Sequence, residues 1–595
     1  MSSSLGSPAP AGPGRSQAGR PGPARPAPVR AEPVPADPGQ AEPGPAHSGP
    51  AHSGPAHSGP AHSGPAHSGP AHSGPAHSGP AEAAAETARP SPGTRALAWA
   101  GAGAILLAIL IMIAASLAHG SWMDPRQLPM PAAGPPWELH VPVPPDLVTA
   151  GLWVAAVLGG AGVLAALAAV RRGFRVSVRA VLITAFIAVA VLTVLPPVGS
   201  TDALDYAAYG RIALLGHSPY VVVPAQLRLT HDAIGPWIPF EWQKHVTLYG
   251  PAATVEQLAA ARLGGTSMAR ITFWLKLWNS IAFGAVAFAA DRLLRSDPVA
   301  RLRAHLLWTI NPLLLWGLIA SGHIDTLGAA FGLLGLLLIG TRPGSAAGRA
   351  VAGPLRALAA GLLIGVAADI KISFLLFAAG LAWALRRSPI ALTAAACGSL
   401  AVLVPTYAWF GPPAVRALLQ RTSKVTIDNF YQLVSKWLTS GHYLVPVAAV
   451  LVLTLAVLML WRMPRGQPGL PAIRPALALT IAWLFVWPYQ LPWYDAMLIC
   501  LLVLYPASRL DWLVLIRLTA GTTALMPGNP TMPHSPLLAS IARADQHVVV
   551  PLVLLGVTIW LVVLCVTGRW KVSRPAPPDA AIAASPAGRT RAVQG

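Results

Sequence analysis

Two carboxylates three residues apart are the feature of this sequence best suited to chemistry. Asp202 and Asp205 directly follow a long apolar run and open the stretch TDALDYAAYGRIALLGHSPY (201–220). If a helix begins here, a spacing of three residues places both side chains on nearly the same face. Such a pair at a membrane edge can supply a general base and its electrostatic partner. Acidic residues are also favoured in the first turn of any helix, so the local sequence leaves the two readings equally open.

Other ionisable residues lie where one apolar run ends and the next begins. His323 and Asp325 fall within SGHID (321–325), while Asp369 and Lys371 fall within ADIK (368–371). Ionisable groups beside apolar helices are costly and often serve ligands or proton transfer. The His-x-Asp pair could bind a sugar hydroxyl or a cation, or form a hydrated turn. Lys371 could neutralise a lipid phosphate or simply pair with Asp369.

Aromatic residues gather in two further segments. TLYGP (247–251) contains Tyr249, and WPYQLPWYD (487–495) contains Trp493 and Tyr494. Aromatic side chains can wall a sugar or lipid site, although they are also enriched at every membrane interface. The stretch 197–270 is long for a connection, and loops of that length are usually functional.

Apolar runs must position all of these residues, since 54% of the 595 residues are hydrophobic and only 11% are charged. Soluble proteins carry about 25% charged residues, so this composition predicts a membrane protein. The sequence predicts an all-α polytopic bundle of about 13 to 14 transmembrane helices. The predicted spans are 96–118, 147–170, 178–196, 271–290, 303–320, 325–340, 356–369, 371–386, 389–409, 443–461, 474–488, 494–507, 511–526 and 547–567.

Both terminal segments are predicted to be disordered. Residues 1–95 are rich in Pro, Ala and Gly, with the repeat AHSGP running from 46 to 80, and residues 571–595 have a similar composition. Segments with so little apolar surface cannot offset their chain entropy. The membrane domain is therefore expected to span 96–570.

The distribution of basic residues predicts an orientation in the cell membrane. Lys and Arg concentrate in the short connections 171–179, 291–303, 341–356, 461–465 and 568–574. Such connections face the cytoplasm. Both termini are then cytoplasmic, and 197–270 is an extracytoplasmic loop. The net charge of +20 thus reflects topology, and no nucleic-acid partner is expected.

Taken in order, the motifs resemble the actinobacterial polyprenol-phosphomannose-dependent alpha-1,6-mannosyltransferases, which are integral-membrane glycosyltransferases of the GT-C fold. The resemblance rests on 201–220, TLYGP (247–251), NPLLLWGLIASGHIDTLG (311–328), ADIK (368–371) and QLPWYDAML (490–498). It implies a GT-C-type bundle with a large extracytoplasmic loop carrying short helices. It also implies a polyprenyl-phosphate-mannose donor in the bilayer and a lipid-anchored alpha-1,6-mannan (lipoglycan) acceptor.

The resemblance further implies roles for individual residues. The family's acidic residue falls on Asp202, the expected general base, whereas Asp205 stands where relatives often have a small polar residue. Arg211 is a candidate phosphate contact. His323 and Asp325 are expected to line the sugar pocket. The remaining expected substrate-binding residues are Tyr206, Tyr220, Tyr249, Lys371, Trp493 and Tyr494.

The implied reaction is a single inverting displacement. The base would accept the proton of the acceptor 6-hydroxyl as that oxygen attacks the anomeric carbon, so that a beta-linked donor gives an alpha product. Lys371 or an arginine would stabilise the leaving polyprenyl phosphate.

Two alternatives stay open: a lipid or sugar transporter or flippase, and a GT-C transferase of another sugar. A transporter predicts repeated halves with ionisable groups near the membrane midplane, whereas the acids here lie at the ends of spans. The sequence has no GxxxxGK[ST] loop and no Asp-x-Asp of the kind that metal-dependent nucleotide-sugar enzymes use, which argues against a nucleotide donor. No cofactor is predicted, and the need for a divalent cation is left open.

Overall fold

The computed structural model describes residues 90–119, 128–139, 141–240, 242–340, 353–419, 425–434, 443–467, 469–525 and 535–570. The AHSGP repeats and the segment 571–595, both predicted to be disordered, lie outside these residues. The sequence also predicts that 411–441 is external and that its cations Arg421, Lys424 and Lys436 are available to a phosphate, and these three residues lie outside the described ranges too.

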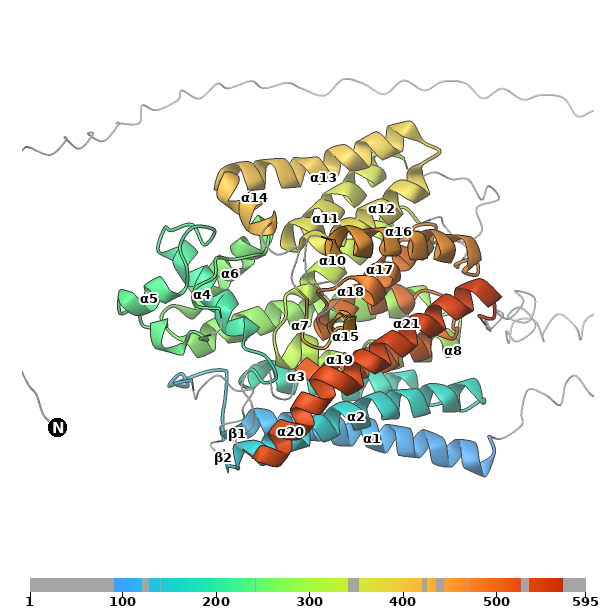
Figure 1. The fold of residues 1–595 in the computed structure, drawn as a ribbon, viewed down its shortest axis with the longest axis horizontal. Coiled ribbons are helices and arrows are strands. Elements are labelled where there is room, and N and C mark those ends of the chain that lie inside the picture. Colours follow the sequence, from blue (N-terminus) through green and yellow to red (C-terminus); the bar gives the residue numbers. More distant parts are fainter. Residues whose placement is uncertain are drawn as a thin grey trace, which may run out of the picture. The chain divides into compact units, whose positions relative to one another are not determined.

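Long apolar helices make up most of the structure (Figure 1). Within the described ranges, seven helical segments are long and apolar enough to cross a membrane. Several begin with Pro in the first turn after a Ser or Asp cap, because the fixed φ of Pro suits that position and the cap accepts a free backbone N–H. Six of these segments are α1 (Pro92–Leu117), α2 (Pro145–Arg171), α7 (Met268–Leu293), α13 (Pro389–Phe410), α16 (Leu444–Arg462), and α20 (Pro536–Ala544) continuing through η6 (Asp545–Val549) into α21 (Val550–Thr567).

The seventh segment, Pro298–Ala320, is broken, and it is buried from Leu302 onward. It consists of α8 (Pro298–Leu307), α9 (Pro312–Leu314) and the π-helical turn η3 (Leu315–Ala320). Asn311 caps the second part through its side chain, which accepts from the N–H of Leu313 at 3.1 Å. A π turn commonly marks a functional site, and this one leads directly into His323.

Shorter helices fill the space between the long ones. Each of the predicted spans coincides with helix, including those shorter than a full membrane crossing. The shorter helices are α3 (Val178–Val194), α10 (Asp325–Leu338), α11 (Pro354–Ile370), η4 (Ile372–Phe374), α12 (Leu375–Leu385), α14 (Pro412–Leu419), α15 (Tyr431–Val434), α17 (Ile473–Val486), η5 (Pro492–Tyr494), α18 (Asp495–Leu502) and α19 (Leu510–Leu525).

The predicted loop 197–270 contains short helices, as expected: α4 (Asp202–Leu214), α5 (Ala225–Leu229), η2 (Gly235–Trp237) and α6 (Pro251–Gly264). The helices α4 and α6 pack on each other and on α7, around a core of their own that includes Leu204, Ala260 and Leu275. Figure 1 shows these helices together at one end of the bundle.

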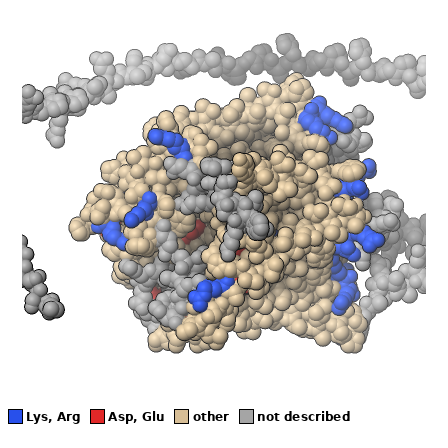
Figure 2. Space-filling model, in the orientation of Figure 1, with Lys and Arg blue, Asp and Glu red and all other residues tan. Residues whose placement is uncertain are grey.

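Basic residues concentrate at the opposite end. Arg171 at the end of α2 and Arg303 in α8 both pair with the buried carboxylate of Asp511, at 2.8 and 2.6 Å. The N–H of Arg509 donates to the carbonyl of Trp570, just beyond α21, at 3.2 Å. Figure 2 shows Lys and Arg gathered along the edge where α2 and α21 end in Figure 1.

The predicted all-α polytopic membrane fold is therefore confirmed. Among the described residues, extended structure is limited to β1 (Ala118–His119) and β2 (Val141–Pro142), which pair in parallel.

Candidate active site

A cavity of about 710 Å³ lies at the end of the bundle that carries α4. The start of α4, the segment 248–249, the corner after α11, α14 and the segment 487–494 form its walls. Most of its lining is apolar, and much of it is aromatic. The aromatic lining residues are Tyr206, Tyr209, Trp242, Tyr249, Trp483, Trp487, Tyr489, Trp493 and Tyr494.

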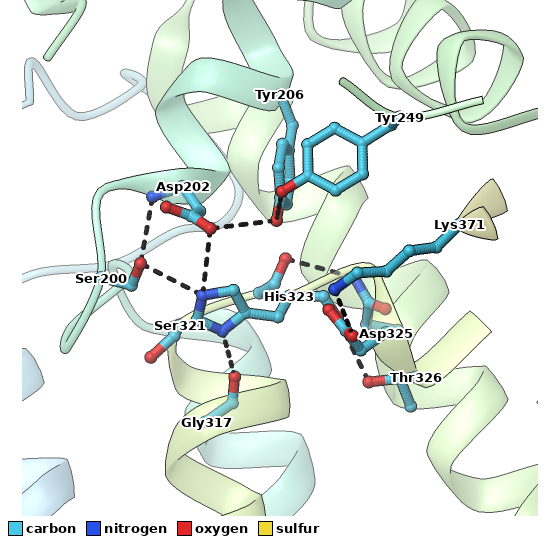
Figure 3. A network of polar contacts seen from close by, with 12 residues as sticks. Ser200, Asp202, Tyr206, Tyr249, Gly317, Ser321, His323, Asp325, Thr326 and Lys371 are labelled. Carbon is cyan, nitrogen blue, oxygen red and sulfur yellow. Dashed lines mark hydrogen bonds and ion pairs between the residues drawn. The ribbon is translucent and has the colours of Figure 1, made fainter. Parts of the chain in front are cut away.

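Asp202 reaches this cavity from the first turn of α4 (Figure 3). Its backbone N–H donates to the Ser200 hydroxyl at 3.2 Å, and its carboxylate accepts from the Tyr206 hydroxyl at 3.3 Å. His323 Nε2 lies 3.5 Å from the same carboxylate oxygen. These contacts hold the carboxylate in place. The side chain of Asp202 is still 16% exposed, so the carboxylate remains open to the cavity.

The turn before α4 depends on a glycine. Gly199 has a φ of +101°, and a Cβ there would lie 1.9 Å from Nε1 of Trp316 in η3. A side chain at this position would be strained and would collide with the π turn. Gly199 therefore lets the chain enter α4 with Asp202 directed toward the cavity.

His323 is completely buried beneath Asp202. Its Nδ1 donates to the carbonyl of Gly317, which can only accept, and Nε2 lies 3.1 Å from the Ser200 hydroxyl. The ring stacks on Trp493 with centroids 3.8 Å apart and planes 13° apart. These contacts fix Nε2 toward Asp202 and Ser200.

The surroundings favour the charged form of Asp202. Burial alone would raise its pKa. This effect is outweighed by the interactions with His323, by the charge of Lys371 and by the hydrogen bond from Tyr206, so that the pKa of Asp202 falls below its ordinary value. Burial raises the pKa of Tyr206 and Tyr249 well above the ordinary value, so both remain neutral hydroxyls. Their oxygens lie 3.0 Å apart.

Lys371 supplies a positive charge to the same cavity. Its Nζ lies 2.6 Å from Oδ1 of Asp325, which is completely buried, and 3.4 Å from the ring centre of Tyr494. Burial lowers the pKa of Lys371, opposed by the carboxylates of Asp325 and Asp202. Cation and acid therefore face one cavity, with the Tyr206–Tyr249 pair beside them (Figure 3).

A close backbone contact joins the Tyr249 segment to the Lys371 corner. The N–H of Gly250 donates to the carbonyl of Ile370 at 3.2 Å. A Cβ on Gly250 would lie only 1.8 Å from the carbonyl oxygen of Asp369. Only glycine permits this approach, which holds Tyr249 near Lys371.

The structure brings most of the predicted site residues together. Asp202, Tyr206, Tyr249, Lys371, Trp493 and Tyr494 line the cavity. Asp205 also contributes to the lining but is 4% exposed, inside α4. His323 and Asp325 lie behind the wall, where they contact Asp202 and Lys371.

Besides His323 and Asp325, two further predicted residues do not line this cavity. Arg211 forms a two-pronged ion pair with Asp232, at 3.0 and 2.9 Å. The hydroxyl of Tyr220 donates to the carbonyl of Tyr249 at 2.9 Å and contacts the Thr254 hydroxyl. Both residues brace the segments that surround the site.

Ser200, Trp483 and Arg517 were not among the residues predicted for the site. Arg517 in α19 pairs with the buried Asp495 and donates to Gln490 Oε1 at 2.7 Å, behind the aromatic segment. The position of Arg517 inside the predicted span 511–526 could have indicated a buried partner, because a charged residue within a membrane span requires one. Ser200 and Trp483 gave no comparable signal. No group of three or more His, Cys, Asp or Glu within the described ranges could hold a metal ion.

These features define a multi-pass membrane protein in which an acid and a cation face one aromatic cavity. Residues 98–387 match the family model described as alpha-(1->6)-mannopyranosyltransferase, N-terminal domain, so the predicted family resemblance is confirmed. The match contains the Asp202, His323 and Lys371 positions.

Curated relatives from actinobacteria carry the same name. A probable alpha-(1->6)-mannopyranosyltransferase of Mycolicibacterium smegmatis is 34% identical over 151 residues, which is 25% of this chain and 26% of the relative. The Mycobacterium tuberculosis enzyme is 31% identical over 150 residues, 25% of this chain and 24% of the relative. Alpha-(1->6)-mannopyranosyltransferase B of Corynebacterium glutamicum is 25% identical over 156 residues, 26% of this chain and 25% of the relative.

The alignments thus span about a quarter of the length of each relative. Among solved structures, the chain shows a distant likeness to ArnT from Cupriavidus metallidurans bound to undecaprenyl phosphate. The TM-score is 0.36 at 18% identity, covering 66% of this chain and 78% of that one.

Proposed function

We propose that the protein transfers mannose from polyprenyl-phosphate-mannose to an alpha-1,6-mannan on a lipid-anchored acceptor. One observation carries the proposal: Asp202 and Lys371 line the same aromatic cavity, in a chain that matches an alpha-(1->6)-mannosyltransferase family. Glycosyl transfer from a lipid phosphate needs a base for the acceptor and a cation for the leaving group.

Asp202 is the base in this mechanism. Its carboxylate accepts the proton of the acceptor 6-hydroxyl while that oxygen bonds to the anomeric carbon of mannose. The bond from the anomeric carbon to the phosphate oxygen breaks in the same step, and its electron pair leaves with the polyprenyl phosphate. Attack opposite the leaving group converts a beta-linked donor into an alpha-linked product.

Lys371 stabilises the charge that develops on the leaving phosphate. Its ammonium already lies between the Asp325 carboxylate and the Tyr494 ring, so it needs little reorganisation when phosphate arrives. Tyr206 and Tyr249 are neutral donors beside Asp202 and can orient sugar hydroxyls.

The rest of the cavity suits the other parts of the donor. The rings of Trp483 and Tyr494 lie nearly parallel, with centroids 5.9 Å apart, and offer flat apolar surface to a sugar face. Leu375, Leu376 and Leu418 extend the lining with aliphatic surface suited to an isoprenoid chain.

From the positive-inside rule we infer that this site faces away from the cytoplasm and that both termini are cytoplasmic. Clustering of basic residues at the end opposite α4 supports that orientation (Figure 2). The donor would then reach the site from the outer half of the plasma membrane.

The test uses purified full-length protein in proteoliposomes that contain polyprenyl-phosphate-mannose with a labelled mannose. A soluble alpha-1,6-dimannoside is added outside. Labelled trimannoside is the expected product. Movement of the labelled lipid across the bilayer without any trimannoside would contradict the proposal and favour a flippase.

A further inference from the structure

A second cavity, of about 380 Å³, adjoins the first. The two cavities share Leu248 and Ala417 as lining residues, and Leu248 directly precedes Tyr249 of the candidate active site. A group bound in the second cavity therefore lies next to the place where Asp202 is expected to act.

The lining carries two cations. It includes Lys244 and Arg416, and the described residues that line it include no Asp or Glu. Both cations are exposed, and neither forms an ion pair with another described residue. By contrast, Arg211 in the same segment has its own carboxylate partner, Asp232. Within the described residues, Lys244 and Arg416 are thus cations of this cavity whose charge can be directed to a ligand.

The backbone around this cavity is fixed. The N–H of Thr247 donates to the carbonyl of Pro219 at 3.0 Å, and the Tyr209 hydroxyl donates to the carbonyl of His245 at 3.1 Å. Tyr220 packs with Ala417 of α14 and stacks edge-on against Phe410, with ring centroids 5.0 Å apart. Lys244 and Arg416 therefore extend from a braced framework, which lowers the cost of ordering a ligand between them.

The surroundings suit a lipid headgroup. Val221 lines the cavity and is 62% exposed, and Val415 and Leu419, on the helix α14 that carries Arg416, are 44% and 64% exposed. Exposed aliphatic side chains beside cations are typical of the level where headgroups meet acyl chains. Arg binds phosphate oxygens through a planar fork and Lys binds them as a point charge, so the pair fits a phosphate.

We propose that the second cavity binds the phosphate of the lipid anchor of the acceptor, and so places the mannan end at Asp202. The inference rests on the proposed function, which assigns the donor phosphate to Lys371 in the first cavity. The two substrates would then use separate cationic sites, joined at Leu248 and Ala417.

The test measures equilibrium binding to full-length protein in nanodiscs. The probes are an alpha-1,6-dimannoside joined to an octyl chain through a phosphodiester, its neutral octyl glycoside counterpart, and a short polyprenyl phosphate. The variant is Lys244→Ala with Arg416→Ala. Arg262→Ala is the matched control because Arg262 is exposed at the end of α6 and lines neither cavity.

The double variant is expected to bind the phosphodiester probe at least about tenfold more weakly, with the neutral probe, the polyprenyl phosphate and the control unchanged. Exchanging the two cations, Lys244→Arg with Arg416→Lys, is expected to restore most of the binding. Unchanged phosphodiester binding, equal weakening of the neutral probe, or selective weakening of the polyprenyl phosphate would each overturn the inference. Because binding is measured without turnover, a lack of mannose transfer would contradict only the proposed function.

Discussion

Replacing His323 with Phe tests whether this buried ring controls the charge of Asp202. The substitution keeps an aromatic ring to stack on Trp493 but removes the nitrogen 3.5 Å from the Asp202 carboxylate. A hydrogen bond to a charged group contributes about 1.5–3 kcal/mol, and a contact of this length belongs at the lower limit. About 1.4 kcal/mol corresponds to one pH unit in a titration.

The direction of the effect follows from the role of the carboxylate. Asp202 acts as a base only when deprotonated, so activity is present above its pKa and is lost as pH falls through it. Contacts with His323 help to lower that pKa, while burial opposes them. His323→Phe should therefore move the acid limb of the kcat profile upward by about one pH unit. Near neutral pH the loss should be smaller than in acid.

The assay is mannose transfer in detergent across the acid range, with His305→Phe as the matched control. His305 is also buried and also contacts an aspartate, Asp291 at 2.9 Å, but lies outside the cavity. Its profile should keep the wild-type shape. An acid limb that stays in place in His323→Phe, with a uniform fall in activity, would refute the positioning role of His323.

Three further predictions concern Lys371, Asp325 and Gly199. Lys371 must be protonated to stabilise the leaving phosphate, and burial lowers its pKa, so activity should fall as pH rises through that lowered value. Lys371→Arg stays charged and should move the alkaline limb of the kcat profile to higher pH. An alkaline limb that does not move would contradict the role of Lys371 in stabilising the leaving phosphate. Asp325→Asn should leave the Lys371 ammonium without its buried partner and cost up to about 3–5 kcal/mol in detergent unfolding experiments, whereas an unchanged unfolding curve would contradict the importance of this pair. Gly199→Ala should destabilise the protein by about 1–3 kcal/mol because of its φ of +101° and the collision with Trp316. Gly103→Ala is the control, since Gly103 has open space around it. Equal stability of the two variants would contradict the requirement for glycine in the turn before α4.

The helices were largely predictable from the sequence, because a run of apolar residues long enough to cross hydrocarbon leaves the backbone few alternatives to helix. The predicted break between 303–320 and 325–340 is present, and the π turn η3 adds detail that hydropathy does not encode. The predictions for the terminal tails lie almost entirely outside the described residues.

The candidate site was predictable in its members and less so in its arrangement. The sequence left open whether Asp202 and Asp205 act as a catalytic pair. In the structure Asp202 contacts His323 and Tyr206, while Asp205 is 4% exposed inside α4. His323 was expected to line a sugar pocket, but it lies behind the acid. Its contact with Asp202 joins positions 121 residues apart, and local spacing cannot reveal such a contact.

The partner of Lys371 shows the same limit. Sequence proximity suggested Asp369, but the structure pairs Lys371 with Asp325, which is 46 residues away. The backbone of Asp369 instead packs against Gly250. Tertiary packing of α10 against α11 decided between the two carboxylates.

The central claim is that Asp202 activates the acceptor hydroxyl. The most direct measurement is kcat for mannose transfer from a beta-linked polyprenyl-phosphomannose to an alpha-1,6-dimannoside by Asp202→Asn. The control is Asp297→Asn, which removes the carboxylate that caps α8 while keeping a good cap. We expect a loss of about 10²–10⁴-fold in kcat for Asp202→Asn, with donor binding retained and the control unchanged. Wild-type kcat in Asp202→Asn would contradict it.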